Sequence, residues 1–321
     1  MRGFDKVTRL QRSIRVHTDT SAKRRISYGD SHYHRMFVDD VSNGLVPFRM
    51  RTIPDISVTL DPANEEVERI IALGFGRDQY RLDITGAVFD AMRDAVHTLL
   101  GFGEAPYEIV YLRDNESDKL IGFDLSFIPP WTLTREGDIW IQKIPEEYAK
   151  QRKCLPRIEL PLNAVVRLVP PSPVRKFYSQ MIEDLDLLGR DLYPEFAIPK
   201  TASFPNDTGF NFQEWHRSHN IALAQASCES GWNARSSFAD SISEYYFLHR
   251  FLKFEEFKLD LRKSILSQLN EVLRIAGASI GFSARLVMHG LPSPEDIERS
   301  RRDLESGNMT FADVMKPYML Y

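Results

Sequence analysis

The sequence has very little cysteine, no long apolar run and no strong charge of either sign. Its two cysteines, Cys154 and Cys228, are too few for a disulfide framework or a four-thiolate metal site, and they fit a reducing compartment. No apolar run approaches the roughly 20 residues that a membrane span requires. The N-terminus MRGFDKVTRL lacks the apolar segment of a secretory signal. We therefore expect a protein that is made and used in a cytoplasm and has no membrane partner.

Motifs for common catalytic and nucleotide-binding sites are also missing. There is no G-x-x-x-x-G-K-[ST] loop, no H-E-x-x-H and no G-x-S-x-G. His216 and His219 lie three apart on an expected helix, a spacing that two metal ligands can use, but no carboxylate or thiolate stands at a ligand spacing beside them. The sequence therefore predicts no catalytic residue, no cofactor, no metal and no enzyme. The net charge of −4 does not by itself indicate a nucleic-acid partner.

The overall composition is that of an ordinary globular protein. Of its 321 residues, 43% are hydrophobic and 27% are charged. The longest pattern is Tyr245–Ala276, which has no glycine or proline and whose apolar residues recur at steps of three and four. This spacing predicts a helix of roughly 40 Å with one apolar stripe, and Glu255 and Lys258 form a favourable pair on its polar faces. Gly277 is the expected end of the helix.

The other expected elements are helices and short strands. Helices are expected at residues 61–73, 83–100, 174–188, 212–230 and 294–306 and in a short segment after Thr310, and strands at residues 56–60, 107–112, 120–127, 139–141, 158–160, 165–169 and 282–288. Gly74 and Gly101–Gly103 are interpreted as helix ends. The strands 107–112 and 120–127 are expected to form a hairpin. This hairpin would belong to a small mixed sheet on which the two preceding helices pack, which indicates an α+β fold.

Residues 1–50 are expected to form a basic N-terminal arm with little apolar periodicity. Lysine and arginine outnumber aspartate in its first 35 residues. Such an arm can contact an anionic surface, which would be nucleic acid or a neighbouring subunit. A solvated tail explains the same composition, and both interpretations stay open.

Two blocks of the sequence together resemble the portal proteins, the head-to-tail connectors of tailed bacteriophages. In residues 99–172, a helix ending at a glycine is followed by the hairpin YEIVYLRD…KLIGFDLSFIPP and by LPLNAVVRLVPPS, similar to the order of strands in the portal wing domain. In residues 244–315, a long helix is followed by a strand, by GLPSPEDIERSRRDLESG and by NMTFADV, similar to the end of the portal core. The chain departs from the family in being short, and Ala312-Asp313 and Met315 replace the usual Asn-Glu and Arg of the final motif.

The resemblance implies a portal-like, ring-forming fold and a division of the chain into parts. These parts are a basic N-terminal arm (1–50), a wing (51–173), a first stem helix (174–189), a clip (190–211), a second stem helix (212–230), a channel loop (231–243), and a long helix with a C-terminal wing or crown part (244–321). Rings of this family hold twelve copies at one capsid vertex of the virion and conduct double-stranded DNA during packaging and ejection. The implied partners are other copies of the chain, that DNA, the major capsid protein, the terminase large subunit and the head–tail adaptor.

A channel that conducts DNA must not bind it tightly. Each phosphate neutralised by Lys or Arg strengthens binding, and a ring repeats every such contact in each subunit. Arg235 is the one cation of the loop GWNARSSFADS, and we predict that it lies closest to the DNA phosphates. Arg217 on the second stem helix is the second candidate. A surface or intersubunit ion pair is the alternative for both residues. Two other functions stay open: another virion component, such as a head-completion or minor capsid protein, and a nucleic-acid-processing enzyme in which His216, His219 and an acidic residue converge.

Overall fold

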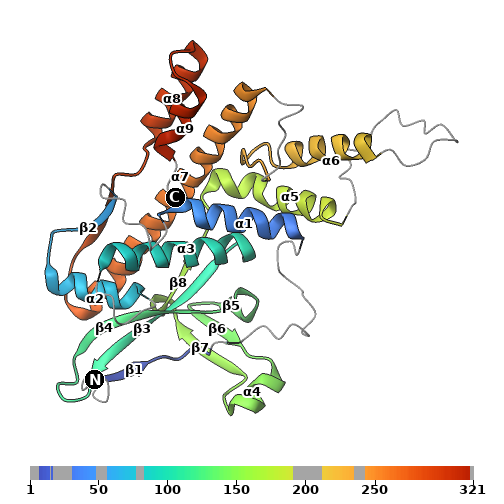
Figure 1. Cartoon of the computed structure of the whole chain (residues 1–321). Coiled ribbons are helices and arrows are strands. Elements are labelled where there is room, and N and C mark those ends of the chain that lie inside the picture. Colours follow the sequence, from blue (N-terminus) through green and yellow to red (C-terminus); the bar gives the residue numbers. More distant parts are fainter. Residues whose placement is uncertain are drawn as a thin grey trace. The chain divides into compact units, whose positions relative to one another are not determined.

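The computed structural model describes residues 7–14, 16, 31–47, 56–76, 83–190, 212–234 and 243–318, which form an α+β fold (Figure 1). The α+β class expected from the sequence is thereby confirmed. The chain divides into two compact units. Unit 1 contains residues 1–26, 46–170 and 262–291, and unit 2 contains residues 27–45, 171–261 and 292–321. Among the described helices, none combines the length and the apolar content needed to cross a membrane.

Unit 1 is built on the antiparallel hairpin that the sequence predicted, with two short strands sharing the other edge of β3. Its main sheet and the helices before it are β1 (Val7–Leu10), β3 (Ala105–Asp114), β4 (Leu120–Phe127), β8 (Val165–Leu168), α2 (Glu65–Phe75) and α3 (Ile84–Phe102). The helix α2 packs on β4, where the rings of Phe75 and Phe123 meet edge to face with centroids 5.5 Å apart. It begins after Asn64, whose side chain accepts two backbone N–H groups, and not at Asp61-Pro62 as expected.

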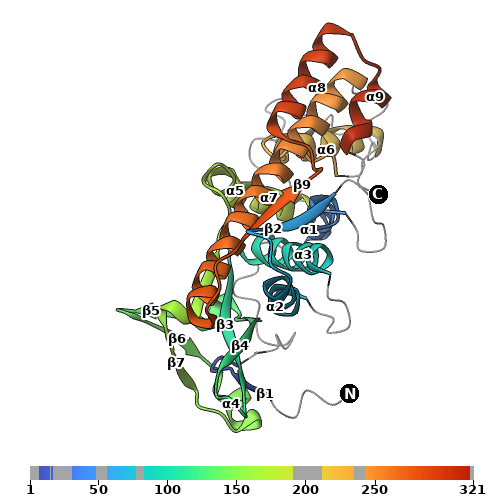
Figure 2. The same ribbon diagram turned by 90° about the vertical axis from the view of Figure 1, so that its left-hand side faces the viewer.

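Two smaller antiparallel sheets complete unit 1 (Figure 2). They are the three-stranded sheet of β5 (Leu133–Glu136), β6 (Ile139–Lys143) and β7 (Arg157–Pro161), and the two-stranded ribbon of β2 (Ser57–Asp61) and β9 (Arg285–His289). The sequence did not predict β5, nor the helix α4 (Glu146–Arg152) between β6 and β7. Both are short and mostly exposed, so neither produces a readable apolar period.

The described residues at the start of the chain are built into unit 1. The buried carboxylate of Glu108 accepts hydrogen bonds from the backbone N–H groups of Arg12 (2.9 Å) and Ser13 (2.7 Å). The buried amide of Gln142 accepts from the N–H of Ile14 (2.9 Å) and donates to its carbonyl oxygen (2.8 Å). Residues 7–14 are therefore not a solvated tail. The groups that hold them come from β3 and β6, which are far away in sequence, so local periodicity could not reveal them.

Side chains also occupy the outer edges of the ribbon β2–β9. The Thr85 hydroxyl accepts from the N–H of Val58 (3.0 Å) and donates to its carbonyl (3.3 Å). On the other edge, Asn270 of α7 accepts from the N–H of Leu286 (2.7 Å) and donates to its carbonyl (3.2 Å). Each side chain occupies the backbone N–H and C=O groups to which an adjacent strand would hydrogen-bond. No further strand can therefore pair with the ribbon at Val58 or at Leu286.

Replacing Asn270 with aspartate is expected to lower the free energy of unfolding by about 2 kcal/mol at pH 7. The carboxylate still accepts from the N–H of Leu286 but sets a second acceptor against its carbonyl oxygen. Protonation restores a donor, so the loss should shrink as the pH falls toward 4. Urea unfolding followed by circular dichroism at both pH values measures this, with Asn163→Asp at an exposed position as the control of equal charge. Equal losses in the two variants would contradict the assignment.

Unit 2 is helical in its described residues, and it includes a helix within the segment expected to be an arm. Its helices are α1 (His32–Leu45), α5 (Ser172–Leu188), α6 (Phe212–Ala226), the first part of α7 (Glu244–Ile280), α8 (Pro294–Ser306) and α9 (Phe311–Met315), followed by the 3₁₀ turn η6 (Lys316–Tyr318). α1 buries Phe37, Val38, Val41 and Leu45, and it packs on α5. This spacing is helical, but aspartates and basic residues interrupt it in the sequence and obscured the pattern.

The C-terminal helices form the core of unit 2 with α7. Buried members of this core are Leu248, Leu252, Leu259, Ile297, Leu304, Val314 and Tyr318. Ser293 and Asp296 form a capping box at the start of α8, and Thr310 accepts the N–H of Asp313 at the start of α9. Both helix starts are confirmed, because their caps involve residues close together in sequence.

The pair Glu255–Lys258 of α7 exists but is buried, and not on an exposed polar face as expected. The carboxylate and ammonium lie 2.6 Å apart, and each side chain is 4% exposed. The Lys258 ammonium also lies 4.9 Å from the centre of the Phe254 ring. The ion pair, and the contact of the ammonium with the aromatic ring of Phe254, offset the free-energy cost of removing both charges from water.

Three glycines expected to end helices lie inside them. α2 continues through Gly74 to Phe75, α3 through Gly101 to Phe102, and α7 through Gly277 to Ile280. A Cβ atom on Gly74 would lie 2.6 Å from the Phe123 ring, and one on Gly277 would lie 2.4 Å from the carbonyl oxygen of Phe282. Close packing, not a left-handed turn, explains glycine at positions 74 and 277, whereas a Cβ atom on Gly101 would meet no atom within 4 Å. Gly103, in contrast, ends α3 in the left-handed conformation.

Candidate functional site

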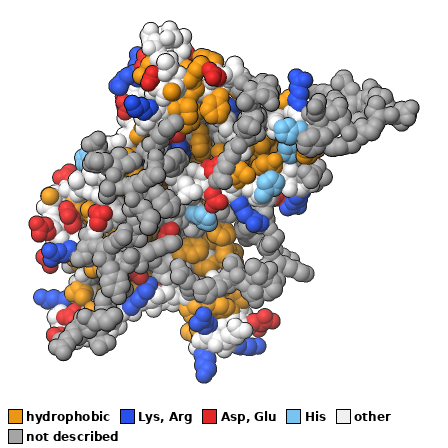
Figure 3. All heavy atoms as spheres, in the orientation of Figure 1, with side chains coloured by type: hydrophobic (Ala, Val, Ile, Leu, Met, Phe, Trp, Pro, Cys, Tyr) orange, Lys and Arg blue, Asp and Glu red, His pale blue; other side chains and the backbone are white. Residues whose placement is uncertain are grey.

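The structure describes one of the two cations predicted to face DNA. Arg217 is exposed on α6 and forms no ion pair with any described residue. Arg235 lies outside the described residues, as do residues 191–211 of the expected clip and residues 235–242 of the expected channel loop. On the face shown in Figure 3, hydrophobic and histidine side chains come to the surface in the region where Figure 1 labels α6.

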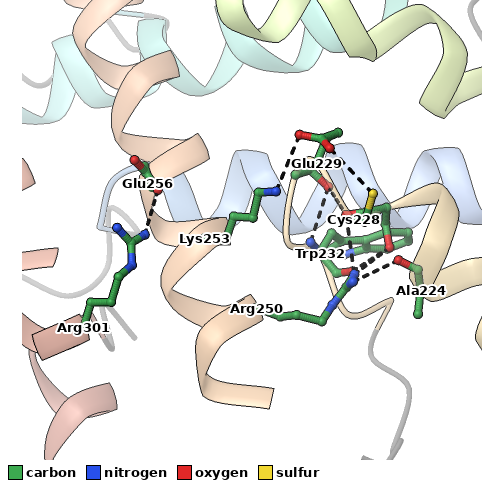
Figure 4. Close-up of polar contacts among 10 residues, drawn as sticks. Ala224, Cys228, Glu229, Trp232, Arg250, Lys253, Glu256 and Arg301 are labelled. Atoms are coloured by element: carbon green, nitrogen blue, oxygen red, sulfur yellow. Dashed lines mark hydrogen bonds and ion pairs between the residues drawn. The ribbon is translucent and has the colours of Figure 1, made fainter. Parts of the chain in front are cut away.

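The turn between α6 and Arg235 is fixed by an arginine of α7 that the sequence analysis did not select. Arg250 donates from Nη1 to the carbonyl oxygen of Ala224 (2.9 Å) and from Nη2 to the hydroxyl of Ser227 (2.8 Å). It also donates to the carbonyl oxygen of Trp232 (2.6 Å) and from Nε to the side chain of Asn233 (2.8 Å). Figure 4 shows its guanidinium reaching from α7 to Ala224 and Trp232. One side chain thus holds both ends of the turn.

The charge of Arg250 is buried, since the residue is only 3% exposed, and these bonds go to neutral oxygen atoms. The carbonyl groups at the end of α6 have no partner within the helix, and the helix dipole makes this end partly negative. A guanidinium with several fixed donors is suited to such a cluster of oxygens. The sequence held one signal, because Arg250 precedes the apolar residues Phe254 and Phe257 by four and seven positions and so lies on their face of α7.

Trp232 and Gly231 fix the same turn from other sides. The indole N–H of Trp232 donates to Asp40 of α1 (2.9 Å), and its ring meets Phe37 edge to face at 5.3 Å. Gly231 has φ of +74°, and a Cβ atom there would lie 2.5 Å from the carbonyl oxygen of Arg250. The chain therefore reaches Ala234, the residue before Arg235, along a defined path.

His216 and His219 have different surroundings on α6. His219 is buried, lies 2.8 Å from the hydroxyl of Tyr33, and stacks on Trp215 with centroids 5.3 Å apart. His216 is exposed and lies 3.3 Å from the amide of Asn220. Within the described ranges, no group of three or more His, Cys, Asp or Glu side chains is arranged to hold a metal ion.

The two cysteines are free and lie in different settings. Cys154 is half-buried beside a small apolar cluster of unit 1 that includes Ile144 and Ala149. Cys228 is exposed after the end of α6, with its thiol 3.8 Å from the Glu229 carboxylate.

No family model matches the chain, and no curated protein matches it. A function for this chain therefore has to be inferred from the order of its elements and from the chemistry of the surfaces described above. The part that bears most directly on function is the run from α5 through α6 and the turn held by Arg250 into α7.

Proposed function

We propose that this chain is a portal-type protein, one subunit of a ring at a capsid vertex of a tailed bacteriophage that conducts double-stranded DNA during packaging and ejection. The order of elements carries the proposal. A small α+β unit is followed by α5, by residues 191–211, by α6, by a tightly held turn and by α7, a helix of 37 residues. This order supports the assignment of wing, first stem helix, clip, second stem helix, channel loop and long helix. The packing of α5 against α6 also supports a paired stem.

The chemistry of α6 and of the turn after it supports passage of DNA without tight binding. Residues 218–228 contain no Asp, Glu, Lys or Arg, so Arg217 is the last charged residue of α6. Each Lys or Arg that neutralises a phosphate adds affinity through counterion release, and a ring repeats each such contact in every subunit. A surface with few cations lets a duplex slide. Arg235, next in sequence after the fixed turn, remains our proposed nearest neighbour of the phosphates.

The proposed ring has partners at its two ends and at its rim. As its binding partners we propose the major capsid protein, the terminase large subunit, which is the packaging motor, and the head–tail adaptor. Its proposed final location is the virion. The expected stoichiometry is twelve copies.

The mass of the purified full-length chain tests the proposal. Light scattering after size-exclusion chromatography should give a mass near twelve times the 37.1 kDa protomer, and negative-stain images should show a ring with a central hole. A monomer at every accessible concentration would contradict the proposal. Rings or pentons without a wing, stem and clip would instead favour another head-completion or minor capsid protein.

A further inference from the structure

Unit 1 holds the first described residues of the chain, which we call the N-terminal segment, mainly by their backbone. β1 pairs with residues 111–114 of β3 (Figure 1), and side chains hold the residues that follow. Glu108 accepts from two successive backbone N–H groups, and Gln142 binds both backbone groups of Ile14. Glu108 and Gln142 are 1% and 0% exposed. These residues, the receiving surface, therefore recognise an extended chain by its main-chain groups, as strand-addition sites do.

Charge and apolar packing add to these backbone contacts. Residues 7–14 contain two arginines and no acidic residue, and the Arg9 guanidinium lies 2.6 Å from the Asp124 carboxylate of β4. Val16 joins a small apolar cluster with residues of α4. Without the N-terminal segment, the buried Glu108 carboxyl group would lose two hydrogen-bond donors, which is costly for a buried polar group. The receiving surface of every copy therefore has to be covered by such a segment.

The covalent route from the N-terminal segment to the rest of the chain is long. Ser13 and Glu108 are 95 residues apart in sequence, so no tight turn ties the segment to the surface that holds it. The segment belongs to unit 1, whereas the chain continues into unit 2, where α1 begins. Residues 17–30 connect Val16 to Ser31, and a chain of this length can span at most roughly 50 Å. This reach exceeds the roughly 30 Å diameter of a small domain, so the segment can extend to a neighbouring copy.

We propose that the N-terminal segment of each copy covers the receiving surface of the next copy in the ring. An exchanged segment makes the same hydrogen bonds, ion pair and apolar contacts as within one chain, so exchange costs little free energy. The segment and the receiving surface are different, so each copy gives one segment and receives one, and a closed ring leaves no receiving surface empty. A basic start of the chain that contacts a neighbouring subunit is among the interpretations that the sequence left open.

This inference rests on the proposed ring and names one contact that joins its copies. It places buried main-chain hydrogen bonds between neighbouring copies, and it uses residues of unit 1 only. The experiments below therefore change neither Arg217 nor Arg235, the two cations considered for DNA.

A disulfide between the N-terminal segment and β3 tests the exchange in the full-length chain. Thr8 and Arg113 are directly opposite in the β1–β3 ladder, and opposite residues of an antiparallel pair have Cα atoms about 4.5–5.5 Å apart, which a disulfide can bridge. After oxidation of Thr8→Cys/Arg113→Cys rings, a non-reducing denaturing gel should show covalent multiples of the 37.1 kDa chain. Each single variant, which keeps Cys154 and Cys228, is the control and should show none. Rings that yield only monomers with an internal disulfide would overturn the exchange.

A mixture of two charge variants tests the exchange without a disulfide. Arg9→Glu and Asp124→Arg each set two like charges against each other, so each variant alone should assemble at an about fivefold higher concentration by mass photometry. Two co-expressed variants that alternate in a ring restore opposite charges only if segments are exchanged, so the mixture should recover. The double variant restores the pair in either arrangement and is the control. A mixture that assembles no better than its members, while the double variant recovers, would overturn the exchange.

The outcomes separate this inference from the proposed function. A wild-type chain that stays monomeric at every accessible concentration defeats the ring itself. A wild-type ring in which the N-terminal segments cross-link only within their own chains defeats the exchange and leaves the ring standing.

Discussion

Replacing Gly231 with alanine is expected to lower the free energy of unfolding by about 4 kcal/mol. The backbone φ of +74° costs an L-residue about 1–2 kcal/mol. The added Cβ atom would also lie 2.5 Å from the carbonyl oxygen of Arg250 and 2.6 Å from the backbone nitrogen of Phe254. Both are main-chain atoms of α7, so the turn itself must move. Urea unfolding followed by far-UV circular dichroism measures the loss.

Gly307→Ala is the matched control for this prediction. Gly307 ends α8 with φ of +69°, close to that of Gly231, but a Cβ atom there meets no atom within 4 Å. The control should therefore lose only the conformational part, about 1 kcal/mol. If both alanine variants lose the same stability, the close approach of the turn to α7 contributes nothing.

Arg250→Met should also cost about 4 kcal/mol in the free energy of unfolding. Methionine fills much of the same volume, but it removes the Arg250 donor from the carbonyl oxygen of Ala224 and leaves that of Trp232 with the Ser227 hydroxyl alone. Each buried polar group left without a partner costs about 1–3 kcal/mol. Thermal and urea unfolding both measure the loss, and Arg250→Lys should fall between wild type and methionine because one ammonium cannot reach all four acceptors.

Arg274→Met is the control for this substitution on the same helix. The side chain of Arg274 is 68% exposed, and it pairs with Glu271 one turn earlier. Solvent screens such a pair, so its removal should leave the unfolding midpoint nearly unchanged. A midpoint that falls as far as in Arg250→Met would show that the effect belongs to α7 in general and not to the turn.

The sequence predicted those features that depend on neighbouring residues. The hairpin β3–β4 follows from two apolar runs around an acidic turn, and the starts of α8 and α9 follow from the caps Ser293 and Thr310. The existence of α7 follows from a long helical period without proline. Each of these signals lies within one element, where propensity and capping act directly.

The sequence could not predict the contacts that join distant segments. Gln142 and Arg250 each bind backbone groups of another segment, and no residue type or spacing marks an amide or guanidinium for that role. Gly277 looked like a helix end because glycine often follows the last turn of a helix, whereas here α7 runs on to Ile280 and the carbonyl oxygen of Phe282 leaves no room for a Cβ atom. Of the candidate site, the sequence identified the exposed Arg217 but not the buried residue that directs the chain toward Arg235.

The hydrogen bonds of Thr85 and Asn270 have a consequence for how folded copies of the chain meet. The ribbon β2–β9 has only two strands, and its outer backbone groups are those with which another ribbon would begin a fibril. The two side chains already occupy these groups at Val58 and Leu286. A folded copy of the chain therefore offers no free backbone groups at Val58 and Leu286 to which a strand of another copy could add.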